Sequence, residues 1–355
     1  MSAHPRKPTS DLVIVDPVKL QFHIQRSCVS KTQFAERMGV GRTSLYRMLD
    51  GLEVRRSLVL SLAHKLAVPM DDLLQHASPP PTASSASPWN HGEWELIPAT
   101  LSAFTPLSNG LVMRSAKVRH RLLSHEFGRA KVYDVGGMPA AVRDRCRQAL
   151  TRHAEAARRL RGVNHVAHNL TMTSSADGAI WTSVDRWFDG VWLDELTDVT
   201  STRAAYIMQQ VGLAIVALHQ AGIVARELSP RRILVNAADQ VLVTDLELCK
   251  LLDAEGSVSH DWLRNPFRAP EVVTGTDHHQ ADYYSFARIY LSLAATHFSS
   301  DGAEPTDDER VLEPFIPQPE IRRAVVACLS PIWHQRPTDI RPLVSQLQEL
   351  CEHDN

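Results

Sequence analysis

Two kinds of hydrophobic pattern divide the chain. Between residues 17 and 76, apolar side chains recur every three or four residues in short runs, the period of amphipathic helices, and five short helices are expected. From Trp94 onward, runs such as 111–118 and 129–135 are typical of β-strands. A long helix is expected over about 139–160, and the end of the chain is mainly helical. The pattern predicts a small helical part followed by a larger part of mixed strands and helices.

A segment of unusual composition separates the two parts. Residues 77–89 contain four prolines, four serines and no charged residue, which favours a semi-extended linker over about 77–91. The length of 355 residues also favours two domains, because a domain usually takes about 100–200 residues. We therefore predict a disordered N-terminus over 1–16, a helical domain over 17–76, and a larger body over 92–355.

The charge is distributed unequally between the parts. The formal net charge is −2, but residues 1–76 hold 11 Lys and Arg against 7 Asp and Glu, and the remainder holds 27 against 33. A basic appendage on a mildly acidic body indicates a contact with nucleic acid. No apolar run reaches the roughly 20 residues that cross a bilayer, and the N-terminus lacks the apolar core of a signal peptide. Together with five scattered cysteines, these features predict a cytoplasmic protein with no membrane partner.

The N-terminal pattern contains two short helices joined by a glycine turn. Ser30 is a suitable N-cap for a helix that Gly39 ends, and the next helix covers about Arg42 to Leu49. In a helix-turn-helix this second helix lies in the major groove of DNA, where its side chains bond bases and phosphates. Lys31 lies where a backbone phosphate would be. The residues predicted to bind DNA are Lys31, Arg42, Thr43, Ser44, Tyr46 and Arg47.

Residues 30–51 and 62–74 resemble the lambda-repressor/Cro (XRE-type) helix-turn-helix family. The resemblance implies sequence-specific binding to double-stranded DNA, and a homodimer, because such domains usually read paired half-sites. Lys31 departs from the Gln that the family usually has, which puts the base specificity of that contact in question. The alternative is a small helical bundle that contacts another protein.

The larger part resembles the eukaryotic-like protein kinase fold over about residues 94–352. Residues 218–235 are similar to the catalytic-loop region, residues 245–247 occupy the place of the DFG motif, and residues 269–271 read Ala-Pro-Glu, as in the APE motif. The resemblance implies a bilobal α+β domain. The expected fold class is thus multidomain, an all-α helix-turn-helix domain followed by this kinase-like domain, with an N-lobe over 92–190 and a C-lobe over 191–355.

The resemblance also implies roles for single residues. Lys131 fits the VAIK lysine, Glu155 its partner on the following helix, and Asp245 a magnesium ligand. The hinge would be 185–187, and Gly110 is the one glycine of the expected phosphate-covering loop. The expected nucleotide-binding residues are Lys131, Glu155, Asp185, Trp187, Arg232, Asp245 and Gly110. The expected structural residues are Asp282, which would brace the catalytic loop, and Glu271, which would pair with Arg336.

Several positions of the chemistry differ from the kinase pattern. Glu227 stands where the catalytic Asp would be, and Ser229 where a Lys would contact the transferred phosphate. Arg232 stands where an Asn would bind the second magnesium, and a guanidinium cannot coordinate metal. Glu247 replaces the glycine of DFG. A retained scaffold with altered chemistry is the pattern of a pseudokinase.

We therefore predict a DNA-binding transcriptional regulator, of bacterial or phage origin, whose pseudokinase domain senses a ligand or a protein partner. One alternative is an active Ser/Thr protein kinase that uses ATP and Mg, with Glu227, Lys131 and Asp245 as catalytic residues and Asp245 as the metal ligand. A further alternative is a non-catalytic interaction scaffold.

Overall fold

The structure is a computed structural model that describes most of the chain. The described residues are 12–16, 19–20, 23–24, 31–49, 52–66, 68, 70–74, 93–103, 105–106, 111–136, 138, 140–197, 199–253, 265–275, 278–294 and 309–353. The chain divides into two compact units, Met1–Ala86 and Ser87–Asn355. The division falls within the expected linker at 77–91, which lies outside the described residues.

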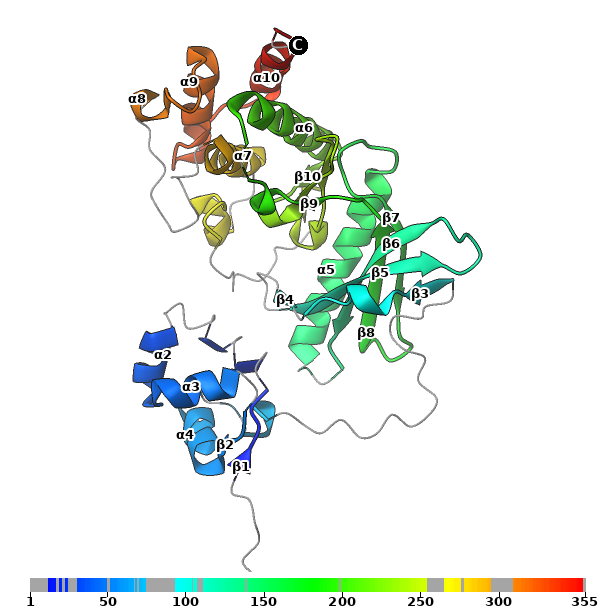
Figure 1. The fold of residues 1–355 in the computed structure, drawn as a ribbon, viewed down its shortest axis with the longest axis vertical. Helices are drawn as coiled ribbons and strands as arrows, with labels where there is room; N and C mark the ends of the chain where they lie inside the picture. The colour runs from blue at the N-terminus through cyan, green and yellow to red at the C-terminus, as the bar shows by residue number, and fades with distance from the viewer. Residues whose placement is uncertain are drawn as a thin grey trace, which may run out of the picture. The chain divides into compact units, whose positions relative to one another are not determined.

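The N-terminal unit combines short helices with a small sheet (Figure 1). Its elements are β1 (Leu12–Val13), α2 (Lys31–Met38), α3 (Arg42–Leu49), β2 (Val54–Arg55), α4 (Arg56–Leu66) and a 3₁₀-helix at Met70–Asp72. β1 pairs antiparallel with β2. The expectation of an all-α unit is therefore wrong, and residues 12–16, expected to belong to a disordered stretch, include a strand.

A glycine turn ends α2 and leads into α3. Gly39 has a φ of +59°, a conformation that favours glycine, and a Cβ there would lie 2.6 Å from the amino nitrogen of Lys65. Lys65 itself donates to the carbonyl of Met38 at 2.9 Å, which satisfies one of the free carbonyls at the end of α2. Phe34 of α2 and Leu45 of α3 are buried in the same apolar core.

The first part of the C-terminal unit is an antiparallel sheet with one helix. Its strands are β3 (Trp94–Leu96), β4 (Thr105–Pro106), β5 (Val112–His120), β6 (Phe127–Asp134), β7 (Asn169–Ser174) and β8 (Ile180–Arg186). They lie in the order β3-β5-β6-β8-β7, with β4 paired to β5, and α5 (Ala140–Arg159) connects β6 to β7. A 3₁₀-helix at Pro98–Thr100 follows β3.

The alternation of side chains along β6 places its residues on the two faces of the sheet. Ala130 and Val132 join one apolar cluster, whereas Tyr133 and Val135 pack with residues of α5. Lys131 shares the face of Tyr133, because a strand has a side-chain period of two. Figure 1 shows α5 lying along the sheet.

The second part of the C-terminal unit is mainly helical. Its helices are α6 (Ser201–Gln220), α7 (His279–Ala294), α8 (Glu309–Leu312), α9 (Pro319–Cys328) and α10 (Arg341–His353), with 3₁₀-helices at Leu193–Glu195, Pro230–Arg232, Leu246–Leu248, Pro270–Thr274 and Trp333–Gln335. Short strands form two further sheets: β9 (Val191–Trp192), β11 (Ile233–Val235) and β12 (Val241–Val243) make one, and β10 (Ile223–Val224) and β13 (Lys250–Leu251) make the other.

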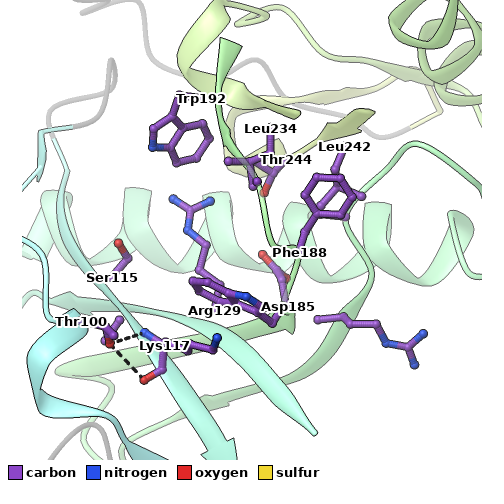
Figure 2. A pocket seen from close by; sticks show the side chains of 15 residues that line it. Thr100, Ser115, Lys117, Arg129, Asp185, Phe188, Trp192, Leu234, Leu242 and Thr244 are labelled. Carbon is purple, nitrogen blue, oxygen red and sulfur yellow. Dashed lines mark hydrogen bonds between the residues drawn. The ribbon is translucent and has the colours of Figure 1, made fainter. Parts of the chain in front are cut away.

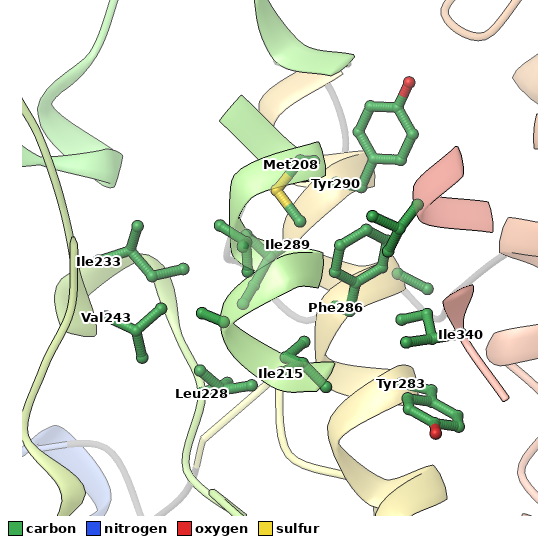
Figure 3. Packing of buried hydrophobic residues seen from close by; sticks show 14 of the residues in the cluster. Met208, Ile215, Leu228, Ile233, Val243, Tyr283, Phe286, Ile289, Tyr290 and Ile340 are labelled. Carbon is green, nitrogen blue, oxygen red and sulfur yellow. The ribbon is translucent and has the colours of Figure 1, made fainter. Parts of the chain in front are cut away.

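The helices of this part enclose a large apolar core. Figure 3 shows Met208 and Ile215 of α6 beside Phe286 and Ile289 of α7, and all of them are fully buried. The expected mixture of strands and helices in the larger part is confirmed. None of the helices in the described ranges has the length and the apolar character that crossing a membrane would require.

Candidate functional site

A pocket of about 190 Å³ lies between the sheet and the helical part of the C-terminal unit. β5 and β6 contribute polar side chains, including Lys117 and Arg129, and the helical part contributes Leu234 and Leu242 (Figure 2). The segment that connects the two parts, residues 187–190, lines the pocket as well. The pocket thus has an apolar floor and a cationic wall, a combination that suits a planar ligand with negative charge.

The connecting segment is tied closely to both parts. The backbone N–H of Trp187 donates to the carbonyl of Phe127 at 3.0 Å, and the ammonium of Lys117 lies 4.2 Å from the ring centroid of Trp187. A Cβ at Gly190 would lie 2.7 Å from the carbonyl oxygen of Val235, so the close approach of the two backbones requires glycine. Trp187 therefore lines the pocket at the position where the hinge was expected.

Lys131 is fully buried behind the pocket wall, next to the lining residue Asp185. Its ammonium lies 3.2 Å from Asp185 and 3.0 Å from Asp245, and it also pairs with Glu247. Burial alone would lower the pKa of Lys131, but the carboxylates of Asp185, Glu247 and Asp245 outweigh it and hold the pKa above its ordinary value. Asp185 lies at the end of β8 and acts as a partner of the lysine, not as part of the connecting segment.

Glu155 does not contact Lys131, and the assignment of that pair is corrected. Glu155 instead binds Arg158 at 2.7 Å and Arg159 at 2.9 Å, and these hydrogen bonds lower its pKa to about 2. The buried positions of α5 include Cys146, Leu150 and His153, which recur at the helical period and face the sheet. Glu155 lies outside this stripe, so α5 offers no carboxylate to the lysine in its described residues.

Glu247 supplies the carboxylate that Glu155 does not. It lies on the 3₁₀-helix directly after Asp245, is 1% exposed, and accepts a hydrogen bond from the hydroxyl of Tyr133 at 2.8 Å as well as from Lys131. Burial opposes its ionisation, but the charge of Lys131 lowers its pKa below the ordinary value. The sequence suggested only an extra negative charge at this position.

Arg129 is a site residue that the sequence analysis missed. Its guanidinium donates to Asp245 at 3.1 Å and lies 4.8 Å from the ring centroid of Trp192. Figure 2 shows this side chain extending from the sheet toward Trp192 across the pocket. The available signal was the strand period, because Arg129 is two residues from Lys131 and therefore on the same face.

The catalytic-loop region is held by buried polar contacts. Asp282 of α7 accepts hydrogen bonds from the backbone N–H groups of Ala225 and Arg226, each at 2.8 Å. Its carboxylate also lies 2.8 Å from Nε2 of His219. Arg226 has a φ of +65°, and its side chain donates to the carbonyl of Leu248 at 3.1 Å. The structure thus places Asp282 against the loop that the sequence assigned to it.

Two further buried pairs involve the Ala-Pro-Glu segment. Arg336 binds Glu271 through two hydrogen bonds, of 2.6 and 2.9 Å, so the structure brings this expected pair together. Glu227, at the position of the catalytic base, is 1% exposed and forms an ion pair with Arg268. Asn265 also donates to Glu227, at 3.3 Å. The carboxylate is therefore already bound by donors from residues 265–268.

Arg232 lies beside Asp245, where the second metal ligand was expected. It donates to the backbone carbonyl of Asp245, and Asp245 itself adopts a left-handed backbone with a φ of +63°. Burial opposes ionisation of Asp245, but Arg129, Lys131 and Arg232 hold its pKa well below the ordinary value. Within the described ranges, no three His, Cys, Asp or Glu side chains are arranged to hold a metal ion. Gly110 lies outside the described residues.

The residues expected to bind DNA lie on α3 and at the start of α2. Arg42, Thr43, Tyr46 and Arg47 are exposed, and Ser44 is half-buried. Arg42 forms an ion pair with Glu36 at 3.2 Å, and Arg47 donates to the carbonyl of Glu53 at 3.0 Å. Both of these contacts are at the surface. The side chain of Lys31 lies outside the described residues.

In the C-terminal unit a sheet with one helix is joined through a pocket to a helical part. Residues 182–354 match the family model of the protein kinase domain. The C-terminal part of the chain therefore carries a protein kinase domain. The expectation of a kinase-like domain at the C-terminus is thus confirmed over residues 182–354.

Two curated relatives illustrate the similarity. One is a Caenorhabditis elegans protein assigned as ribosomal protein S6 kinase alpha-1, 27% identical over 209 residues, which are 56% of this chain and 25% of that protein. The other is the serine/threonine-protein kinase PknA of Mycobacterium tuberculosis (strain H37Rv), 30% identical over 118 residues, which are 32% of this chain and 27% of that kinase. The chain thus covers about a quarter of the length of each relative.

Proposed function

We propose that the C-terminal unit binds a nucleotide in its pocket, and that the chain is a regulator in which this unit acts together with a DNA-binding N-terminal unit. The observation that carries the first part is the pair of Lys131 and Asp245, 3.0 Å apart beside a pocket with an apolar floor. In protein kinases this lysine contacts the phosphates of ATP, and this aspartate binds magnesium. Trp187 lines the pocket, and its indole N–H has no hydrogen-bond partner among the described residues. This N–H is therefore available to donate a hydrogen bond to a ligand.

Two functions of such a domain are to be separated. The similarity to Ser/Thr kinases favours the alternative of an active kinase that uses ATP and Mg over a pseudokinase. The geometry favours binding without transfer, because a general base must be free to accept the proton of the substrate hydroxyl. Glu227 is buried and already bound by Arg268 and Asn265. We propose nucleotide binding as the main function and phosphoryl transfer as the second candidate.

A labelled-phosphate assay separates the two candidates. The full-length chain is incubated with γ-labelled ATP and with Mg²⁺ or Mn²⁺, together with a general substrate protein. We expect no incorporation above that of a heat-treated sample. Incorporation that disappears in both Glu227→Gln and Lys131→Ala, in samples that remain folded, would establish the active kinase and refute the pseudokinase. ATP binding is measured in parallel by calorimetry, so that a domain that binds ATP without transferring its phosphate is recognised.

We propose further that the N-terminal unit binds double-stranded DNA through α3, as a homodimer. The proposal is supported by two short helices joined at residues 39–41 and by the exposed Arg42 and Arg47 on the second of them. Its test is fluorescence anisotropy with a site selected from random duplex DNA, at several salt concentrations. Arg47→Ala should weaken binding by about 1–3 kcal/mol if the arginine contacts a base.

Arg56→Ala is the matched control for this experiment. Arg56 is also exposed and lies at the start of α4, outside the predicted recognition helix. We expect its replacement to change the affinity much less than Arg47→Ala does. If no duplex binds at low salt, the DNA-binding proposal fails and the small unit is better explained as a protein-contacting bundle.

A further inference from the structure

Three cationic side chains contact Asp245. Arg129 and Lys131 both donate to its Oδ1 atom, at 3.1 and 3.0 Å, and Arg232 donates to its backbone carbonyl. The carboxylate is 7% exposed, so these contacts are shielded from water. The carboxylate that would bind magnesium is thus already occupied by Arg129 and Lys131, and Arg232 holds its backbone.

The residues present do not fit a magnesium ion. A kinase holds its metal between the aspartate and an asparagine, whereas this chain has Arg232 at the second position. A guanidinium has five donors and no acceptor, so it cannot ligate a cation. Arg232 also brings a positive charge to the place of the second ligand, where it would repel a divalent ion.

The same side chains fit an anion. A guanidinium presents parallel N–H donors that match two oxygens of a phosphate, and an ammonium adds a point charge. Arg129 lines the pocket, and Arg232 is half-buried beside Asp245. Their charges can therefore neutralise phosphate groups without a metal bridge.

We propose that the pocket binds its nucleotide in the metal-free form, with Arg232 and Arg129 taking the place of the divalent cation. This inference rests on the proposed nucleotide-binding function and specifies the form of the ligand. It assigns Arg232 as the residue that determines metal independence. Arg129 assists by carrying a second charge to the same carboxylate.

The experiment is a titration of the full-length protein with ATP by calorimetry, once with EDTA and once with Mg²⁺ in large excess over ATP. We expect the affinity in EDTA to exceed that in Mg²⁺ by about tenfold or more, because each 1.4 kcal/mol of repulsion is a factor of ten. Arg232→Asn replaces the cation by an amide oxygen that can bind metal. This variant should lose affinity in EDTA and gain it in Mg²⁺.

Arg231→Asn is the matched control. Arg231 precedes Arg232 in the chain, but its side chain is 84% exposed and pairs with Asp194 at 2.7 Å. We expect this variant to keep the metal preference of the unaltered protein. Thermal melting shows whether each variant is folded, and Arg232→Gln repeats the test if Arg232→Asn is not.

The outcomes distinguish this inference from the function on which it rests. Binding that requires Mg²⁺, with no change in Arg232→Asn, would overturn metal-free binding and leave the nucleotide site intact. Absence of binding of ATP, ADP and AMP in both media would overturn the nucleotide site itself, and the inference with it. Tighter binding in EDTA that Arg232→Asn reverses and Arg231→Asn does not would support both.

Discussion

Replacing Lys131 with methionine tests whether this lysine stabilises the fold. Methionine keeps the length of the side chain and removes its charge. In the unaltered protein the ammonium lies among Asp185, Asp245 and Glu247, in a place with no access to water. Arg129 would still pair with Asp245 in the variant. Asp185 and Glu247 would lose their ion pair with the lysine, and Asp185 would keep His153 at 3.9 Å.

The expected loss of stability follows from this geometry. Removing one partner of a buried ion pair costs about 3–5 kcal/mol, because the remaining charge is no longer compensated. For a unit the size of Ser87–Asn355, each kcal/mol corresponds to about 2–4 °C in melting temperature. We therefore expect Lys131→Met to lower the melting temperature by about 6–20 °C at pH 7.

The pH dependence should change as well. Without the lysine, burial and the charge of Asp245 favour the protonated form of Glu247, so its pKa should rise. Protonation then stabilises the folded variant, so its melting temperature should approach that of the unaltered protein as the pH falls from about 7 to about 5. Lys131→Met with Glu247→Gln should recover part of the loss at pH 7, because one uncompensated charge is gone.

The assay is thermal unfolding followed by circular dichroism at several pH values. Lys117→Met is the control, since Lys117 is a half-buried lysine of the neighbouring strand whose ammonium lies over aromatic rings instead of carboxylates. Its replacement should cost far less. A melting temperature of Lys131→Met within about 2 °C of the unaltered protein at pH 7 would show that the buried ion pairs do not stabilise the unit as argued.

Three further results are expected. Glu155→Gln should leave both ATP affinity and melting temperature unchanged, since Glu155 pairs only with neighbouring arginines in the described structure; a clear loss in calorimetry would restore its assignment to Lys131. Glu271→Gln should lower the urea midpoint, with a cost of about 3–5 kcal/mol, because the buried charge of Arg336 loses its carboxylate partner and keeps only backbone carbonyls; an unchanged midpoint would contradict this. Asp185 and Asp245 have lowered pKa values, so their stabilisation is present above pH 4 or so and is lost as the pH falls below it, which acid titration by fluorescence checks.

The regular parts of the fold were predictable because they are long. The strand patterns at 111–118 and 129–135 correspond to β5 and β6, and the helix expected over 139–160 corresponds to α5. The pairing of β1 with β2 was not predictable, because a strand of two residues contains no measurable period. The last helix expected in the N-terminal unit is a single 3₁₀ turn, Met70–Asp72, and three residues are also too few to show a helical period.

Site residues were predictable only where a motif fixes both the residue type and its position along the chain. The Ala-Pro-Glu segment identified Glu271, and the order of the motifs identified Lys131 and Asp245. Glu155 was assigned by its place on the helix that follows the strand of Lys131. The helical phase shows the error, since Cys146, Leu150 and His153 define the buried stripe. The reach of Arg129 to Asp245 depends on the rotamer of a long side chain, which no sequence pattern specifies.

Because Lys131 pairs with Glu247 and not with Glu155, a different part of the fold controls its ion pairs. In a protein kinase the lysine pairs with a glutamate on the helix that follows its strand, so the position of that helix controls the pair. Here the carboxylates lie on β8 and on the segment 245–247, and α5 supplies none in its described residues. α5 packs against this segment, so a shift of α5 would reach the partners of the lysine through it. A shift of the segment 245–247 removes two of those partners and the hydrogen bond from Tyr133 together. Regulation of this site would have to act through that segment.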